Sequence, residues 1–197
     1  PTLSGISLSI MKEKIFSQFQ GMIETTMVVG DLFSDSLSNA AELVSDTLLT
    51  GGTIFTCGEK SGRVIAKLLC DYLTAGFEIE RPGFPALNIH DLCNHTGGQD
   101  QYSDVLNIHA NSNDLLVIAS AGNDDHRLLK VIESGIERGM SVVLLSSIND
   151  EQLVDAVGYN DVHISVANFS GQLAVLAQFQ IVQCLCSLVD DKILGGS

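Results

Sequence analysis

Positively charged residues are scarce in this chain. Among its 197 residues, 10 are Lys or Arg and 24 are Asp or Glu, so the formal net charge is -14 at pH 7. A surface this negative repels the phosphate backbone of DNA and RNA. We therefore expect no direct nucleic-acid binding, whereas binding to a basic protein partner stays open.

The sequence also lacks a run that is long and apolar enough to span a bilayer, and its first residues show no signal-peptide pattern. Both absences predict a cytoplasmic protein without membrane contact. With 45% apolar and 17% charged residues, the composition is typical of one globular domain with a full core.

The five cysteines lack the spacing of a zinc site or a disulfide framework. Cys57, Cys70 and Cys93 are isolated in the sequence. Cys184 and Cys186 lie in a helical stretch, where side chains at positions i and i+2 point in different directions. We interpret all five as buried or inert thiols, and we expect neither a metal nor a cofactor.

The five histidines are scattered and show no metal-binding spacing. His126 follows two aspartates on a predicted helix and is interpreted as a surface residue. His163 alternates with apolar neighbours on a predicted strand, so we expect it to face solvent. No histidine is assigned to a site.

Hydrophobic periodicity predicts alternating helices and strands. Helical spacing covers residues 11–29 and 34–49, with an interruption at Gly30 and Asp31. Strands are expected at residues 53–57, 85–89, 114–119, 141–145 and 162–166, and later helices at 61–75, 124–138 and 172–193.

This order indicates an α/β fold, a five-stranded parallel sheet with helices on both faces. Two helices precede the first strand and are surplus to it, so we expect their apolar faces to pack against another subunit. Residues 94–113 are the least regular, and we expect a loop with at most one short helix there.

In an open parallel sheet, ligands bind beyond the carboxyl ends of the strands, where helix N-termini offer N–H groups to anions. Two loops have this position, residues 58–62 after the first strand and residues 120–124 after the third. Each contains a hydroxyl group and a glycine and precedes a helix. The pattern leaves two interpretations open, a phosphate-binding loop and an ordinary strand-to-helix turn.

Four segments in this order carry a family resemblance: GGTIFTCG, ERPGFPALNIHD, NDLLVIASAGND and IERGMSVVLLSS. They resemble the SIS (sugar isomerase) domain of the phosphoheptose isomerase group, and within it the DiaA type, which associates with the DnaA initiator of replication. The resemblance covers residues 11–197 as a single SIS domain, apart from 94–113, which is shorter here. Residues 1–10 fall outside it and are interpreted as an N-terminal extension, with Met11 as the candidate start.

The resemblance implies an SIS-type, flavodoxin-like sheet, assembled as a homotetramer with sites between subunits. In the isomerases it implies a glutamate and a histidine that exchange protons, often with zinc, because moving a carbonyl along a sugar needs a base and an acid. The family's histidine, glutamate and arginine on the helix after the first loop fall on Leu68, Tyr72 and Gly76. Its glutamine and histidine on the last helix fall on Val175 and Gln178. Leucine and valine cannot bind a metal and glutamine cannot take a proton, so we assign no catalytic residue.

The phosphate-binding loops of the family are altered as well. Gly62 replaces the serine that ends the first loop, although Ser61 lies beside it, and the second loop has lost three hydroxyl groups. Asp124 stands where an anion would bind, and we interpret it as a favourable charge in the first turn of the next helix. Lys60 is either a compensating cation or a solvated lysine. The residues that remain of a phosphosugar site are Ser61, Gly62, Ser120, Gly122, Asn123 and Asp91.

Three functions are compatible with these residues. The first is a non-catalytic regulator of replication initiation that binds the DnaA initiator, for which the resemblance places the contact at Ile193 and Leu194. These two aliphatic side chains could equally pack against their own domain. The second function is a phosphoheptose isomerase with a rearranged site built from Asp71, Tyr72, Gln178 or a neighbouring subunit's histidine. The third is a sensor that binds a sugar phosphate without converting it.

Overall fold

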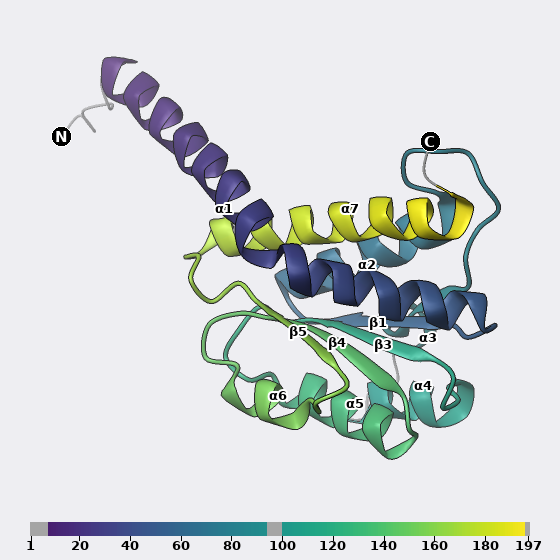
Figure 1. Ribbon diagram of the computed structural model, residues 1–197. Helices are drawn as coiled ribbons and strands as arrows, with labels where there is room; N and C mark the ends of the chain where they lie inside the picture. Colours follow the sequence, from purple (N-terminus) through teal and green to yellow (C-terminus); the bar gives the residue numbers. More distant parts are fainter. Residues whose placement is uncertain (1–7, 94–99, 196–197) are drawn as a thin grey trace.

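The computed structural model describes residues 8–93 and 100–195, and within them strands and helices alternate along the chain (Figure 1). The strands are β1 (Ile54–Gly58), β2 (Ala86–Asn88), β3 (Leu115–Ala119), β4 (Ser141–Ser146) and β5 (Val162–Ser165). The helices are α1 (Leu8–Leu49), α2 (Ser61–Ala75), α3 (Ile89–Leu92), α4 (Gln101–His109), α5 (His126–Glu137), α6 (Glu151–Ala156) and α7 (Gln172–Leu194).

The five strands form one parallel sheet in the order β2-β1-β3-β4-β5. The chain runs from β1 outward to β2 and then returns to the other side of β1 to build β3. The strand order therefore reverses between β1 and β3, whose register pairs Gly58 with Ala119 at their carboxyl ends. The predicted α/β fold with a five-stranded parallel sheet is confirmed.

Helices cover both faces of the sheet. In Figure 1, α1, α2 and α7 lie on one face, and α4, α5 and α6 lie on the other. The sequence of strand β3 is continuously apolar because both of its faces are buried. Leu115 and Val117 belong to the core on the first side, and Leu116 and Ile118 belong to the core on the second. A strand covered on both faces cannot carry a polar face.

The N-terminal region is a single helix of 42 residues rather than the two helices expected from the sequence. Gly30 and Asp31 lie inside α1. A glycine in a helix interior lowers stability relative to alanine by only about 1 kcal/mol, so it does not by itself end the helix. The buried residues Val29, Phe33 and Leu37 continue at a spacing of four residues past this point and join the core on the α7 side. This packing outweighs the weak local signal. Residues 8–10 of the predicted extension form the first turn of α1, and residues 1–7 lie outside the described part.

Helix α7 corrects the expectation that no run could span a membrane. By length and composition it is the one described helix that could do so, with a mean hydropathy of 1.6 over an apolar window of which 44% is buried. Its buried residues, including Ile181, Leu185 and Val189, belong to the core shared with α1 and α2. Packing against α1 and α2 therefore accounts for the buried part of this apolar helix.

Of two short helices, one fits the expected pattern and one does not. The region expected to hold a loop with at most one short helix contains the nine-residue helix α4, and residues 94–99 before it lie outside the described part. Helix α6 was not expected from the sequence, because its six residues are too few to show a helical period.

A buried ion pair joins the end of α2 to α7. Arg81 Nε donates to Asp190 Oδ1 at 2.7 Å, and both side chains are almost fully buried. The Arg81 guanidinium also donates to the carbonyl oxygens of Leu73 and Tyr72 and lies 3.8 Å from the centre of the Phe84 ring. One arginine therefore holds the end of α2, the chain before β2 and the last turns of α7 together.

We expect the substitution Arg81→Ala to lower the free energy of unfolding by about 3–5 kcal/mol, because it leaves the Asp190 carboxylate buried without its partner. Urea denaturation at one fixed protein concentration measures the difference. The matched control is Lys192→Ala, which removes an exposed cation 3.7 Å from Glu42 and Asp46 and should change stability by less than about 1 kcal/mol. Equal effects of the two substitutions would contradict the prediction.

Candidate functional site

The candidate site lies at the carboxyl ends of β1 and β3, where the strand order reverses. Open α/β sheets bind ligands at this switch point. The approach of α2 to this edge is close, because a Cβ added at Gly62 would lie 2.0 Å from the carbonyl oxygen of Ala119. Glycine is therefore required at this position, and it brings the loop after β1 against the loop after β3.

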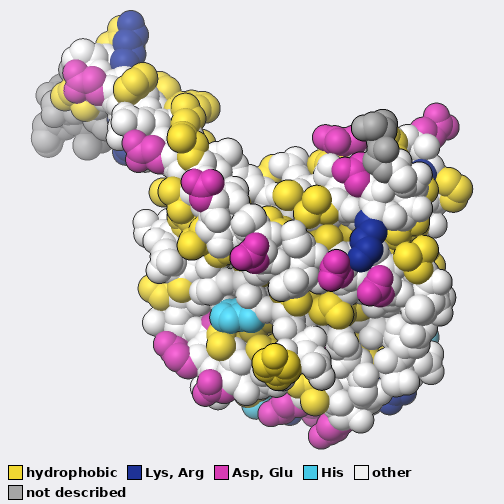
Figure 2. Space-filling model, in the orientation of Figure 1, with side chains coloured by type: hydrophobic (Ala, Val, Ile, Leu, Met, Phe, Trp, Pro, Cys, Tyr) yellow, Lys and Arg dark blue, Asp and Glu magenta, His cyan; other side chains and the backbone are white. Residues whose placement is uncertain are grey.

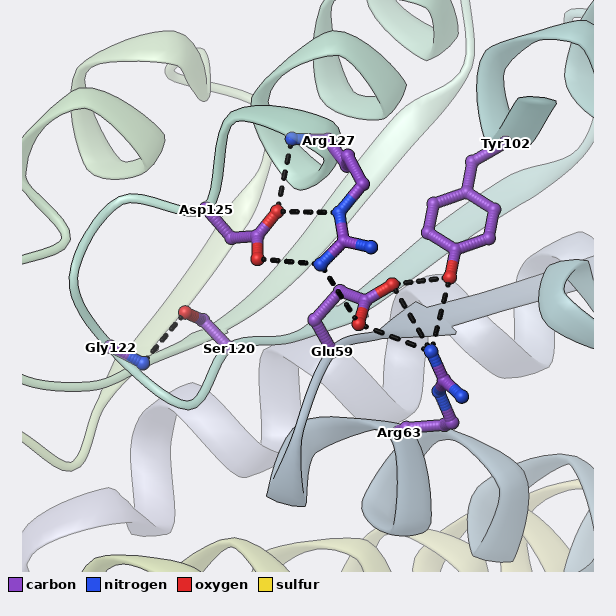
Figure 3. Close-up of polar contacts among 7 residues, drawn as sticks. All are labelled: Glu59, Arg63, Tyr102, Ser120, Gly122, Asp125 and Arg127. Atoms are coloured by element: carbon purple, nitrogen blue, oxygen red, sulfur yellow. Dashed lines mark hydrogen bonds and ion pairs between the residues drawn. The ribbon is translucent and has the colours of Figure 1, made fainter. Parts of the chain in front are cut away.

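The loop after β1 places a buried carboxylate at the centre of the site. Glu59 follows β1 directly, and its side chain is 5% exposed. Arg63 Nη2 donates to Glu59 Oε2 at 3.2 Å, and Arg127 Nη2 lies 3.1 Å from the same oxygen (Figure 3). The Tyr102 hydroxyl donates to Glu59 Oε1. Three donors from α2, α5 and α4 therefore surround one carboxylate.

The partners of Glu59 are themselves held in place. Asp125 accepts hydrogen bonds from the backbone N–H of Arg127 at 3.0 Å and from its guanidinium, so it caps α5 and orients the arginine. Burial of Asp125 opposes its ionisation, but the hydrogen bonds from Arg127 outweigh burial and lower the pKa of Asp125. Burial and the hydrogen bond to Glu59 raise the pKa of Tyr102, so its hydroxyl stays protonated and donates.

The loop after β3 turns its polar groups inward. The buried hydroxyl of Ser120 accepts from the N–H of Gly122 at 3.0 Å. Gly122 has φ 94°, and an added Cβ would lie 2.6 Å from the carbonyl oxygen of Ile148, so glycine is needed here as well. Asn123 donates its N–H to Ile148 at 2.8 Å and accepts from the side chain of Asn149. The loop is thus bonded to the loop after β4.

The sequence analysis placed the charge of Asp124 at the wrong helix. Asp124 lies before α5, whose cap is Asp125, and its Oδ1 accepts from the N–H groups of Gln152 and Leu153 at 2.9 and 3.1 Å. Its charge therefore serves the first turn of α6 rather than that of α5. The backbone N–H of Asp124 in turn donates to Asp150 Oδ1 at 3.0 Å.

The predicted remnant residues lie on three segments, the start of α2, the loop after β3 and α3. Ser61 and Gly62 begin α2 beside the end of β3, close to the loop that contains Ser120, Gly122 and Asn123. Asp91 instead forms an ion pair with Lys67 at 3.1 Å. Lys60 is exposed and has φ 52° between β1 and α2.

The positions to which the family resemblance assigns catalytic residues carry side chains that pack in the core or bond to the backbone. Leu68, Tyr72 and Val175 pack half-buried against the core, and Gly76 ends α2. Gln178 is buried, and its amide nitrogen donates to the carbonyl oxygens of Ser120 at 2.8 Å and Leu145 at 3.3 Å. It thereby braces the ends of β3 and β4.

These contacts limit the chemistry of the site. Both oxygens of Glu59 accept hydrogen bonds from cationic or hydroxyl donors, and Gln178 is bonded to the backbone. The polar groups of Glu59 and Gln178 are therefore bonded to other parts of the chain. Within residues 8–93 and 100–195, no three His, Cys, Asp or Glu side chains group closely enough to hold a metal ion.

Four of the five cysteines are buried, in line with their interpretation as buried or inert thiols. Cys184 is exposed. All five thiols are free. Burial raises the pKa of the Cys186 thiol to about 12, so this thiol is protonated and unreactive at neutral pH.

His163 points away from the core formed with α1 and α7, as expected, but it is only partly exposed to solvent. Its ring is half-buried, and Nε2 lies 2.6 Å from the hydroxyl oxygen of Ser146 on β4. Its side chain lies on the α6 side of the edge strand β5, where burial lowers the pKa of His163 below its ordinary value of 6.5.

The lowered pKa of His163 predicts a pH-dependent stability. Since the unfolded chain binds a proton at His163 more readily than the folded chain does, the free energy of unfolding should fall as the pH drops below about 6.5. Urea denaturation between pH 8 and pH 5 should show a smaller loss for His163→Gln than for the unaltered chain. His109→Gln changes an exposed histidine and should follow the unaltered chain. Identical profiles for all three proteins would refute the assignment.

The sheet order and the two glycine-bearing loops define a doubly wound, flavodoxin-like α/β domain. The chain belongs to the SIS domain family, whose model matches residues 18–147. The DnaA initiator-associating protein DiaA of Shigella flexneri is 25% identical over 190 residues, covering 93% of this chain and 97% of that protein. DiaA of Klebsiella pneumoniae is 24% identical over the same coverage.

Solved structures show the same fold. A phosphoheptose isomerase from Francisella tularensis superposes with a TM-score of 0.82 at 24% identity, covering 92% of this chain and 98% of that one. A phosphoheptose isomerase from Neisseria gonorrhoeae gives a TM-score of 0.81 at 17% identity, covering 92% and 99%. The predicted SIS-type fold is thus confirmed.

Sequence reasoning missed the charged cluster around Glu59. Glu59 and Arg63 are four residues apart, and Asp125 is two residues before Arg127, so each half of the cluster left a weak local signal. Tyr102 left none, because it lies in the segment without clear periodicity. Nothing in the sequence connected the two halves.

Proposed function

We propose that this chain is an SIS-domain protein without isomerase activity that regulates replication initiation in the cytoplasm by binding the DnaA initiator. The observation that carries the proposal is the state of the site. Gln178, at the position of the family's histidine, is hydrogen-bonded to the backbone, and the carboxylate nearest the switch point, Glu59, is enclosed by three donors. The curated relatives named for association with DnaA support the choice of partner.

The end of α7 is the proposed contact surface. Leu194 is 46% exposed, whereas Ile193 is half-buried against the core of its own domain. An exposed aliphatic side chain at the end of a helix suits the apolar centre of an interface. The net charge of -14 favours encounter with a basic surface.

The proposal is tested by titrating the purified chain with the DnaA initiator protein in a calorimeter. We expect saturable binding, weakened about tenfold or more by Leu194→Ser, because a central apolar contact contributes more than about 1 kcal/mol. Ile108→Ser is the matched control, since it removes an aliphatic side chain that is 74% exposed on α4, across the sheet, and should leave the affinity unchanged. Absence of binding, or equal weakening by both substitutions, would reject the proposal.

A second readout separates this function from the two alternatives. The same sample is titrated with sedoheptulose 7-phosphate, with and without zinc, and assayed for turnover. We expect neither binding nor turnover. Turnover would establish an isomerase with a rearranged site. Binding without turnover would establish a sensor that uses the remnant residues Ser61, Gly62, Ser120, Gly122, Asn123 and Asp91.

Assembly with further copies of the chain, as a tetramer by family resemblance, is part of the proposal. The first half of α1 projects from the body of the domain and displays hydrophobic side chains along its length (Figure 2). The exposed large apolar residues of this arm are Leu8, Ile10, Met11, Ile15, Phe16, Phe19, Met22, Ile23, Met27 and Val28. A contiguous apolar surface of this extent is typical of a subunit interface.

We expect the double substitution Phe16→Ser and Phe19→Ser to reduce the molar mass of the particle in solution while helix content is retained. The two rings are 72% and 62% exposed in the single chain, so their loss removes apolar area from the interface rather than from the core. Light scattering after size exclusion measures the mass. Tyr159→Ser removes an exposed aromatic outside the arm and should leave the mass unchanged. A monomeric unaltered chain, or no change in the double variant, would contradict the role of the arm.

A further inference from the structure

Two arginines from different elements converge on one carboxylate oxygen at the switch point. Arg63 of α2 and Arg127 of α5 each place Nη2 within 3.2 Å of Glu59 Oε2 (Figure 3). Paired guanidinium groups are the donors that proteins use for carboxylates and phosphates. Arg63 and Arg127 are therefore arranged to bind an anion, and the anion between them is the Glu59 carboxylate of the same chain.

The burial of these groups differs in a way that matters for access. The Glu59 side chain is 5% exposed, whereas those of Arg63 and Arg127 are 42% and 41% exposed. The carboxylate thus lies behind the two guanidinium groups, which are open to solvent. An anion from solution can reach the arginines, but Glu59 already holds the position between them.

The arginines are also kept in place independently of Glu59. Arg127 is bonded to Asp125 through Nε and Nη2 at 3.3 and 3.2 Å, and Arg63 Nη2 donates to the Tyr102 hydroxyl at 3.4 Å. Within the described residues, the buried Nε of Arg63 has no hydrogen-bond partner, so one donor of the site remains unused. Removal of the carboxylate would leave an ordered set of donors.

We propose that Arg63 and Arg127 form an anion-binding site for phosphate or a carboxylate, and that Glu59 occupies it and excludes free anions. A group attached to the chain competes at an effective concentration that a ligand in solution does not reach. Glu59 is thus the residue that sets which ligands the switch point accepts. This inference is independent of the proposed initiator binding.

The test is chemical rescue of Glu59→Ala. The variant removes the carboxylate and leaves the donors of Arg63, Arg127 and Tyr102 without it. We expect its thermal unfolding midpoint to fall in chloride and to recover with added inorganic phosphate or acetate at matched ionic strength. The unaltered chain should show no such difference between salts. Phosphate affinity should rise roughly tenfold or more over the unaltered chain, since the new bonds are charge-assisted.

The double variant Glu59→Ala with Arg127→Gln is the control, and it should lose the rescue. Glu59→Gln keeps the size of the side chain without its charge and should show a smaller phosphate effect than Glu59→Ala. If Glu59→Ala does not fold in any salt, Glu59→Gln decides: a phosphate effect that Arg127→Gln abolishes supports the site. Equal responses to phosphate in the unaltered chain and in every folded Glu59 variant would overturn it.

Discussion

The pairing of β1 with β3 places two loops side by side that are far apart in the sequence. Because all five strands are parallel, crossovers must join each strand to the next, and the reversal of strand order between β1 and β3 leaves their carboxyl ends uncovered. The glycine at position 62 allows α2 to approach β3 closely. Three sets of contacts depend on this geometry: the donors around Glu59, the hydrogen bond between Gly122 and Ser120, and the hydrogen bonds from Gln178 to the backbone.

At this edge, groups that would serve a ligand are instead bonded to the chain. Asp124 binds the N–H groups that begin α6, Asp125 binds the first turn of α5, and Glu59 lies between two arginines. Each carboxylate stabilises a loop or a helix end, and together they give the site its own negative charges. A parallel sheet that binds phosphate in other proteins is here closed by internal contacts, which is consistent with a role as a protein-binding scaffold.

The apolar surface is distributed differently from the charges. Much of the exposed apolar surface lies on the projecting half of α1, and a smaller part, Leu194, lies at the end of α7. The two surfaces are on separate elements, so the proposed assembly with further copies and the proposed binding of a different protein would use different residues. Arg81 and Asp190 fix the last turns of α7 to the rest of the domain and therefore also fix the position of Leu194.

The strands and the three long later helices could be predicted from the sequence, because burial on both faces leaves continuous apolar runs in β3 and β4, and one-sided burial leaves a helical period in α5. The continuity of α1 through Gly30 could not be predicted, since packing of Phe33 and Leu37 outweighs a small local cost. Only the tertiary structure brings the pair Glu59 and Arg63 together with Tyr102 of α4 and Arg127 of α5. Periodic burial is encoded locally, whereas a charge is given its partners by the topology of the sheet, and that is the physical reason the fold could be predicted and the cluster could not.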